Sequence, residues 1–216
     1  MTVLITGANR GIGRALYDAY AADGTPVMGT RREAGDAPGW LSLDVRDPAQ
    51  HRAMADTLRN QPVSLLVCNA GVYPDKGARL DDGYGAEMWA EGFATNVTGV
   101  FLSIQALVPN LRQAKGKIAI ISSQMASHTR APGGSYIYRA SKAAALNLGR
   151  NLATDLAIEG IAVGIYHPGW VQTDMGGSTA EITVTEAATG LKERFTALSL
   201  DTTGCFETWD GRPHAY

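Results

Sequence analysis

Short apolar runs alternate with helix-length segments along most of the chain. The runs that we expect to form strands lie at 2–6, 26–30, 40–45, 63–71, 117–123 and 161–169. The segments that we expect to form helices lie at 12–22, 48–60, 87–113 and 136–159. Strands that are apolar throughout are typical of sheets buried on both faces, and their alternation with helices predicts βαβ units. We therefore predict an α/β fold, a Rossmann-type doubly wound parallel sheet with three layers.

The link between the second and third apolar runs departs from this pattern. Residues 31–39, RREAGDAPG, are too few and too rich in glycine and proline for a crossover helix, so we expect a loop or a single turn. The chain shows no internal repeat or low-complexity linker, and 216 residues suit one hydrophobic core. We expect a single catalytic domain that spans residues 1–216.

Composition narrows the range of partners. The chain has 19 lysines and arginines against 21 acidic residues, with no basic stripe, which favours a small molecule over nucleic acid or an anionic membrane. Cys68 and Cys205 have neither metal-site nor disulfide spacing, and we expect no metal. The first residues show no secretory leader, and no apolar run approaches the length of a membrane span. We expect a cytoplasmic protein.

The first apolar run leads directly into a glycine-rich stretch, TGANRGIG. Gly7, Gly11 and Gly13 are spaced as G-x-x-x-G-x-G before a predicted helix. Glycine allows the backbone to turn tightly and to approach a ligand closely. The beginning of the helix offers free N–H groups and a positive dipole end to a phosphate. At the end of a first strand, this pattern predicts a dinucleotide-binding loop.

The residues after the second apolar run indicate which dinucleotide binds. Arg31 and Arg32 lie there, and Arg10 lies within the glycine loop. An arginine can hold a phosphate through two N–H groups, whereas NAD(H) is usually held by an acidic residue at this place. The sequence therefore favours NADP(H). In the alternative, both arginines are solvated and Glu33 binds the ribose of NAD(H).

Tyr138 and Lys142 are four residues apart in the last long predicted helix. Residues at i and i+4 lie on one face of a helix, so the phenol and the ammonium would share a space. A neighbouring ammonium, together with the positive charge of an oxidised nicotinamide, stabilises the phenolate of a tyrosine whose free pKa is about 10 and makes it a usable acid and base. Tyr136 has only Ala140 at i+4. In the alternative, Tyr138 is an ordinary half-buried aromatic and Lys142 is a solvated charge.

Several motifs, in this order, resemble those of the short-chain dehydrogenase/reductase family over nearly the whole chain. They are TGANRGIG, LDV (43–45), CNAG (68–71), FATNVTGVF (93–101), IISSQMAS (120–127), YRASK (138–142) and HPGWVQTDM (167–175). The stretches GGSYIYRASKAAALN and HPGWVQTDMGG are especially similar to C-factor and sniffer-type carbonyl reductases of that family. The resemblance implies four catalytic residues: Asn96, Ser123, Tyr138 and Lys142.

The glycine loop and the resemblance together imply a cofactor site. Its residues are Gly7, Asn9, Arg10, Gly11, Ile12, Gly13, Arg31, Arg32, Asp44, Val45, Asn69, Ala70, Gly71, Tyr138, Lys142, Pro168, Gly169, Val171 and Thr173. By resemblance, Tyr138 exchanges a proton with the carbonyl oxygen and Ser123 donates a hydrogen bond to it. Lys142 also holds the nicotinamide ribose, and Asn96 positions a water molecule that links Lys142 to solvent. In the alternative, Asn96 only bends or caps its helix.

The position of the serine leaves an alternative open. The family separates serine and tyrosine by about a dozen residues, whereas 138 minus 123 gives 15 here. Ser122 and Ser123 point to opposite faces of a strand, and the family places its serine at the strand end, which favours Ser123. Ser127 is the alternative. We expect the extra residues to bulge at 128–134, HTRAPGG.

These motifs predict an oxidoreductase that interconverts a carbonyl and an alcohol with NADP(H). The alternative is a catalytically weak cofactor-binding sensor or signalling protein of the same fold. An epimerase-like relative would need a further substrate domain. Residues 174–195 are expected to form a substrate lid with a hinge at Gly176 and Gly177, over an open site for a small or extended carbonyl compound.

Residues 141–156, SKAAALNLGRNLATDL, carry a face of small side chains. Such a face permits close helix packing, and the family commonly pairs through such helices, so we expect a homodimer or homotetramer. In the alternative, an internal contact between helix and sheet uses the same small residues. His128 and His167 lie near the motifs, but lone histidines are more often structural, and we assign them no catalytic role.

Overall fold

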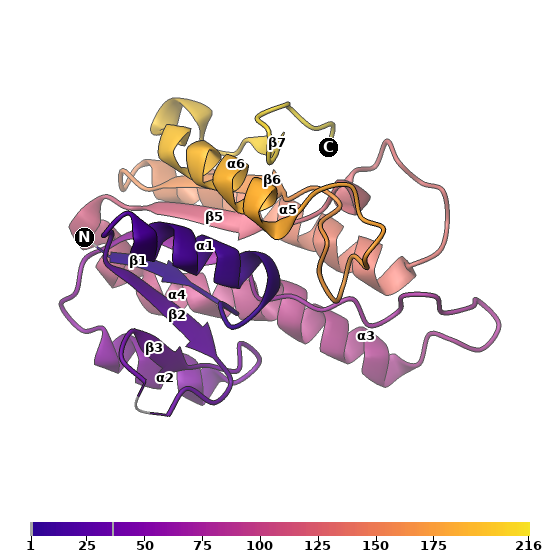
Figure 1. Cartoon of the computed structure of the whole chain (residues 1–216), viewed down its shortest axis with the longest axis horizontal. Coiled ribbons are helices and arrows are strands. Elements are labelled where there is room, and N and C mark those ends of the chain that lie inside the picture. Colours follow the sequence, from indigo (N-terminus) through magenta and orange to yellow (C-terminus); the bar gives the residue numbers. More distant parts are fainter. Residues whose placement is uncertain (1, 36) are drawn as a thin grey trace.

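In residues 2–35 and 37–216, which the computed structural model describes, seven parallel strands form one sheet (Figure 1). They are β1 (Thr2–Ile5), β2 (Val27–Arg31), β3 (Trp40–Ser42), β4 (Val63–Cys68), β5 (Lys117–Ile121), β6 (Ala162–His167) and β7 (Phe206–Thr208). Their order is β3-β2-β1-β4-β5-β6-β7, so the chain reverses its direction of winding between β1 and β4. Open α/β sheets bind ligands at such a switch point.

Helices cover both faces of the sheet. They are α1 (Gly11–Ala22), α2 (Pro48–Thr57), α3 (Ala86–Phe93), α4 (Gly99–Ala114), α5 (Tyr136–Ala157) and α6 (Val184–Ala197). Figure 1 shows α1 and α6 in front of the sheet, and their apolar residues form one buried cluster with it. A second cluster joins the opposite face to α2, α4 and α5. The predicted three-layer α/β fold is confirmed.

The central strands are mostly apolar because both faces of the sheet are covered. Side chains alternate between the faces of a strand, so Leu4 joins one buried cluster while Val3 and Ile5 join the other. The predicted loop between β2 and β3 is confirmed for residues 32–35 and 37–39, which contain no helix. β7 was not predicted, because its three residues, FET, form no apolar run.

The predicted helix at 87–113 is interrupted by one wider turn. A π-helical segment, η1 (Ala94–Thr98), lies between α3 and α4 and contains Asn96. Taken together, α3, η1 and α4 form one helical stretch, Ala86–Ala114. By length and composition this stretch could cross a membrane, contrary to the sequence expectation. In the fold this helical stretch is part of the core. Its second half, α4, packs against β4, and 44% of the most apolar part of Ala86–Ala114 is buried.

The small face of α5 packs against the sheet. A Cβ at Gly149 would lie 2.7 Å from Cγ1 of Ile165 and 3.0 Å from Cδ1 of Ile120. Ala145 and Ala153, one turn to either side, are also buried. These residues therefore serve the internal contact, and they do not carry the argument for an oligomer.

Candidate active site

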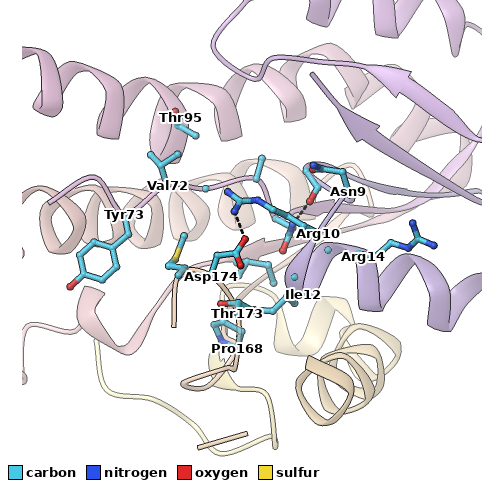
Figure 2. Close-up of a pocket in the computed structure, with 18 of the residues that line it drawn as sticks. Asn9, Arg10, Ile12, Arg14, Val72, Tyr73, Thr95, Pro168, Thr173 and Asp174 are labelled. Atoms are coloured by element: carbon cyan, nitrogen blue, oxygen red, sulfur yellow. Dashed lines mark hydrogen bonds and ion pairs between the residues drawn. The ribbon is translucent and has the colours of Figure 1, made fainter. Parts of the chain in front are cut away.

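A cleft of about 1690 Å³ lies at the carboxyl ends of the strands (Figure 2). Most of the predicted cofactor site lines it: Gly7, Asn9, Arg10, Gly11, Ile12, Gly13, Arg31, Arg32, Asp44, Val45, Asn69, Ala70, Gly71, Tyr138, Lys142, Pro168 and Thr173. Four predicted residues, Asn96, Ser123, Gly169 and Val171, lie outside the cleft lining. Segments from both ends of the chain thus meet at one site, with room for a dinucleotide.

The glycine loop is fitted closely against the end of β4. Gly7 has φ +64°, and a Cβ there would lie 3.0 Å from Cα of Ala70. A Cβ at Gly13 would lie 2.5 Å from the Gly7 carbonyl oxygen. The Asn69 amide donates to the carbonyl oxygens of Thr6 (3.0 Å) and Gly7 (3.1 Å) and so holds the loop in shape. Since α1 begins at Gly11, its first N–H groups suit a phosphate.

The two arginines at the end of β2, Arg31 and Arg32, differ in their surroundings. The Arg31 guanidinium lies 5.1 Å above the Trp40 ring and donates to the Ala34 carbonyl oxygen at 3.0 Å. Its Nε is buried and has no hydrogen-bond partner among the described residues. Arg32 is exposed, and Glu33 also lines the cleft. Arg31 is thus held in place against Trp40 where it lines the cleft, and it is not a freely solvated charge.

Asp44 is engaged by an arginine that the sequence analysis missed. Arg46 donates to its carboxylate at 2.6 and 2.9 Å, and this hydrogen bonding lowers the pKa of Asp44 to about 2. Arg46 also lines the cleft. The signal that could have indicated it is its place directly after the LDV motif. Asp44, the acidic residue of the LDV motif, is therefore ion-paired with Arg46 and does not offer a free carboxylate.

The predicted lid, residues 174–195, consists of two parts. Residues 174–183 are irregular, and a capping box of Thr183 and Glu186 begins α6 at Val184, which also lines the cleft. Arg10 pairs with Asp174 at 2.7 Å, as Figure 2 shows. On the other side, Lys76 donates to the Met175 carbonyl oxygen at 2.8 Å. The lid thus contacts both walls of the cleft.

Tyr138 and Lys142 are both buried where they line the cleft, with 8% and 5% of their surfaces exposed. Lys142 Nζ lies 5.7 Å from the centroid of the Tyr138 ring and donates to the Ile121 carbonyl oxygen at 2.9 Å. This burial excludes the solvated lysine and half-buried tyrosine of the alternative. Tyr136 is 39% exposed and packs edge-to-face on Tyr84.

Burial governs the titration of this pair. It raises the pKa of Tyr138 to about 12, an effect that a hydrogen bond with Ser123 opposes. Burial also lowers the pKa of Lys142 to about 8. Without the cofactor, desolvation is therefore the largest influence on the pKa of Tyr138, and the expected lowering by Lys142 together with an oxidised nicotinamide stays a prediction.

The structure brings Ser123, and not Ser127, to the tyrosine. Ser123 lies two residues after the end of β5, accepts a hydrogen bond from the Met125 N–H at 3.1 Å and lies close enough to Tyr138 to lower the pKa of its phenol. The Ser127 hydroxyl instead contacts Thr129 at 2.8 Å. Ser122 also lines the cleft, but its hydroxyl donates to the Lys142 carbonyl oxygen at 3.1 Å. The 15-residue spacing is absorbed by the exposed loop at 128–134.

Asn96 lies behind the cleft in the π-helical segment η1. Its amide donates to the Val72 carbonyl oxygen (2.9 Å) and to Ser141 (3.0 Å), and it accepts from the Val72 N–H at 2.9 Å. A Cβ at Gly71 would lie 3.2 Å from Asn96 Oδ1 and 3.4 Å from Lys142 Nζ. Asn96 therefore ties the loop after β4 to α5, and π-turns of this kind are frequent at functional sites.

Two further residues near Tyr138 were missed by the sequence analysis. Tyr73 stacks on the Tyr138 ring, and the Asp75 carboxylate accepts hydrogen bonds from the first turn of α5. Both lie in the irregular loop after β4, where no periodic pattern marks them.

His167 is buried, which lowers its pKa to about 4, so it is neutral at physiological pH. His128 is exposed. Among the described residues, no three His, Cys, Asp or Glu side chains cluster to hold a metal.

Comparisons with known proteins agree with this geometry. The family model described as short chain dehydrogenase matches residues 1–183. C-signal of Myxococcus xanthus is 38% identical over 162 residues, which cover 74% of this chain and 96% of that protein. The structure is similar to an NADPH-bound carbonyl reductase from chicken fatty liver (TM-score 0.89, 30% identity, 100% and 98% covered). It is also similar to the carbonyl reductase Sniffer of D. melanogaster (TM-score 0.92, 27% identity, 100% and 99% covered).

Proposed function

The chain belongs to the short-chain dehydrogenase family, as its motifs predicted, and we propose that it is an NADP(H)-dependent reductase of carbonyl compounds. The observation that carries the proposal is the place of Tyr138 and Lys142 at one end of a cleft, with Ser123 next to Tyr138 behind the cleft lining. The glycine loop and Arg31 lie at the other end. A cleft with a phosphate site at one end and a proton donor at the other suits transfer of a hydride together with a proton.

The chemistry assigns a role to each side chain. A bound nicotinamide cofactor would supply the hydride. The Tyr138 hydroxyl gives its proton to the carbonyl oxygen, and burial keeps this phenol protonated at neutral pH. Ser123 donates a hydrogen bond to the same oxygen as negative charge develops on it. By resemblance, Lys142 holds the nicotinamide ribose and Asn96 positions a water molecule that links Lys142 to solvent.

The cofactor preference rests on the arginines. Arg31, Arg32 and Arg10 line the same cleft, so the 2′-phosphate of NADP(H) would meet a cationic site. The similar carbonyl reductase from chicken fatty liver has NADPH bound, which supports the same cofactor for this chain. Glu33, which would favour NAD(H), also lines the cleft, and so both cofactors must be compared directly.

The substrate that we propose is a small or extended carbonyl compound. The irregular part of the lid, residues 174–183, is short and leaves the substrate end of the cleft open. Tyr73 and Met175 line this cleft. We place the protein in the cytoplasm, where its two free thiols, Cys68 and Cys205, would stay reduced. A homodimer or homotetramer remains a proposal from family resemblance, which light scattering tests against the 22.9 kDa monomer mass.

The test is a panel of aldehydes and ketones with NADPH or NADH, followed through the absorbance of the reduced nicotinamide. We expect turnover with NADPH that disappears in Tyr138→Phe purified in the same way, which excludes a contaminating reductase. Turnover that is equal in the two proteins would contradict the proposal.

The second candidate is a cofactor-binding signalling protein with little catalysis. The 38% identity to a protein named C-signal favours it. The two functions separate in one experiment, because a signalling protein of this kind would bind NADPH in calorimetry but reduce no compound of the panel.

A further inference from the structure

The beginning of α5 lacks a cap from its own segment. Ser135 at the N-cap has φ +50°, and its side chain makes no capping hydrogen bond among the described residues. Gly133 and Gly134 before it also have positive φ, at +85° and +69°. The first N–H groups of a helix have no partner within the helix and need an acceptor from elsewhere. This need is acute here, because Tyr138 lies in that first turn.

Asp75 supplies the missing acceptor from the loop after β4. One carboxylate oxygen accepts the Ile137 N–H at 2.8 Å, and the other accepts the Tyr138 N–H at 3.2 Å. Asp75 and Ile137 are 62 residues apart in sequence. Only 1% of the Asp75 surface is exposed. A carboxylate is stabilised at the positive end of a helix dipole, which offsets the cost of burying it.

Tyr73 makes a second contact between the same loop and the same turn. Its ring stacks on the Tyr138 ring with centroids 4.2 Å apart. Its hydroxyl lies 2.5 Å from the Ser135 hydroxyl, at the N-cap of α5. Asp75 thus holds the backbone of Tyr138, while Tyr73 covers one face of its side chain.

We propose that Asp75 is a positioning residue of the active site, whose buried carboxylate caps α5 from a distant loop and fixes the place at which Tyr138 meets Ser123. The proposal rests on the function proposed above for Tyr138. It explains how the first turn of α5 is held although the segment before it, Gly133-Gly134-Ser135, provides no cap of its own.

The charge of Asp75 adds a chemical effect. The charged and titratable groups that face Tyr138 are Lys142 on α5 and Tyr73 and Asp75 in the loop after β4. After burial, which is the largest cause, Tyr73 and Asp75 both raise the pKa of Tyr138. A higher pKa keeps the phenol protonated, which is the form that donates to a carbonyl. Removal of the Asp75 charge should therefore move the alkaline limit of reduction to lower pH.

The first measurement compares Asp75→Asn with Asp82→Asn, an exposed aspartate of the same loop. Asparagine keeps one acceptor oxygen without the charge. We expect kcat of Asp75→Asn to fall by about tenfold or more, because small misplacements of a catalytic group are costly. The dissociation constant of NADPH should stay within about twofold, because Asp75 does not line the cleft. The pH at which kcat falls on the alkaline side should decrease, and Asp82→Asn should match the parent.

The second measurement is amide hydrogen exchange at Ile137 and Tyr138, which needs no substrate. In the parent we expect both amides to be protected, and in Asp75→Asn we expect exchange at least about tenfold faster in that turn alone. If the enzyme reduces no compound of the panel but this protection depends on Asp75, the function proposed for Tyr138 fails while the cap stands.

Three outcomes would overturn the proposal. They are unprotected Ile137 and Tyr138 amides in the parent, parent values of kcat and of the alkaline limit in Asp75→Asn, and a lower melting temperature as the only change in that variant. If Asp75→Asn does not fold, exchange in the parent decides the cap. Tyr73→Phe, which loses only the hydroxyl that contacts Ser135, then tests whether this loop sets kcat.

Discussion

The rings of Tyr73 and Tyr138 stack with their centroids 4.2 Å apart and an angle of 18° between their planes. Tyr73 lies in the loop after β4 and Tyr138 in the first turn of α5, so this contact joins the two sides of the cleft. A ring with one face covered in this way has few orientations open to it. The Tyr138 hydroxyl is therefore held in place near Ser123, and a fixed position is what a proton donor needs.

Replacement of Tyr138 by phenylalanine should abolish most of the activity. The change removes only the hydroxyl, so the stacking with Tyr73 and the affinity for NADPH should persist while kcat falls by about a hundredfold or more. The matched control is Tyr136→Phe, two residues away and exposed, which should keep the parent rate. Steady-state kinetics on one active carbonyl compound decide the matter. A near-normal rate for Tyr138→Phe, or a loss in Tyr136→Phe alone, would assign the acid to another group.

Replacement of Lys142 by methionine should yield a less active but more stable protein at pH 7. Burial lowers the pKa of Lys142 from 10.5 to about 8, so the folded state disfavours its charge. That shift corresponds to about 3 kcal/mol. The lost hydrogen bond from the charged ammonium to the Ile121 carbonyl oxygen is worth roughly 1.5–3 kcal/mol, so the shift is at least as large.

The pH dependence gives the sign of this effect. Below pH 8, Lys142 is charged in both the folded and the unfolded state, so burying its charge destabilises the folded state by the full amount. This destabilisation decreases as pH rises from about 8 to 10.5, because the lysine then becomes neutral in the folded state first. Denaturant unfolding should show the advantage of Lys142→Met at pH 7 and its decrease over that window. The same variant should lose turnover and NADPH affinity together, by calorimetry and kinetics. A variant that is less stable at pH 7 would show that the ammonium is better solvated than its burial indicates.

Neutral residues at the end of β2 should change the cofactor preference. In Arg31→Gln/Arg32→Gln, NADPH should bind about tenfold more weakly or worse, because charge-assisted hydrogen bonds to the 2′-phosphate are lost. NADH binding should change much less. Fluorescence titration with both cofactors measures this, with Arg59→Gln as the control, since Arg59 pairs with Asp56 on the surface. Equal losses for both cofactors, or tighter NADH binding in the parent, would favour Glu33 and NAD(H).

Removal of the lid's ion pair should strengthen cofactor binding. Arg10 pairs with Asp174 at 2.7 Å with both side chains mostly exposed, so the pair competes with a phosphate for Arg10. An exposed ion pair is worth up to about 1 kcal/mol, so Asp174→Asn should lower the dissociation constant of NADPH by about two- to fivefold. Asp56→Asn, which breaks another exposed pair, is the control. Weaker NADPH binding in Asp174→Asn would mean that Asp174 supports the cofactor site.

Local patterns were enough to predict much of this protein. Continuous apolar runs indicated strands covered on both faces, and the sheet at the centre of the fold has this form. Helical periodicity placed Tyr138 and Lys142 on one face of α5, because residues four apart lie one turn apart on any helix. Glycine spacing located the loop at the end of β1. These features depend on neighbours in sequence, so the sequence alone determines them.

Tertiary structure decided what depends on distant neighbours. The direction of the pKa shift of Tyr138 follows from burial, which no i+4 spacing encodes. The sequence favoured Ser123 and left Ser127 open, and in the fold the Ser127 hydroxyl contacts Thr129 while Ser123 lies next to the tyrosine. Asp75 contacts the first turn of α5 across 62 residues, although nothing in its own loop marks it. Desolvation and long-range contacts arise only when the chain is packed, and for that reason the roles of these side chains became visible only in the fold.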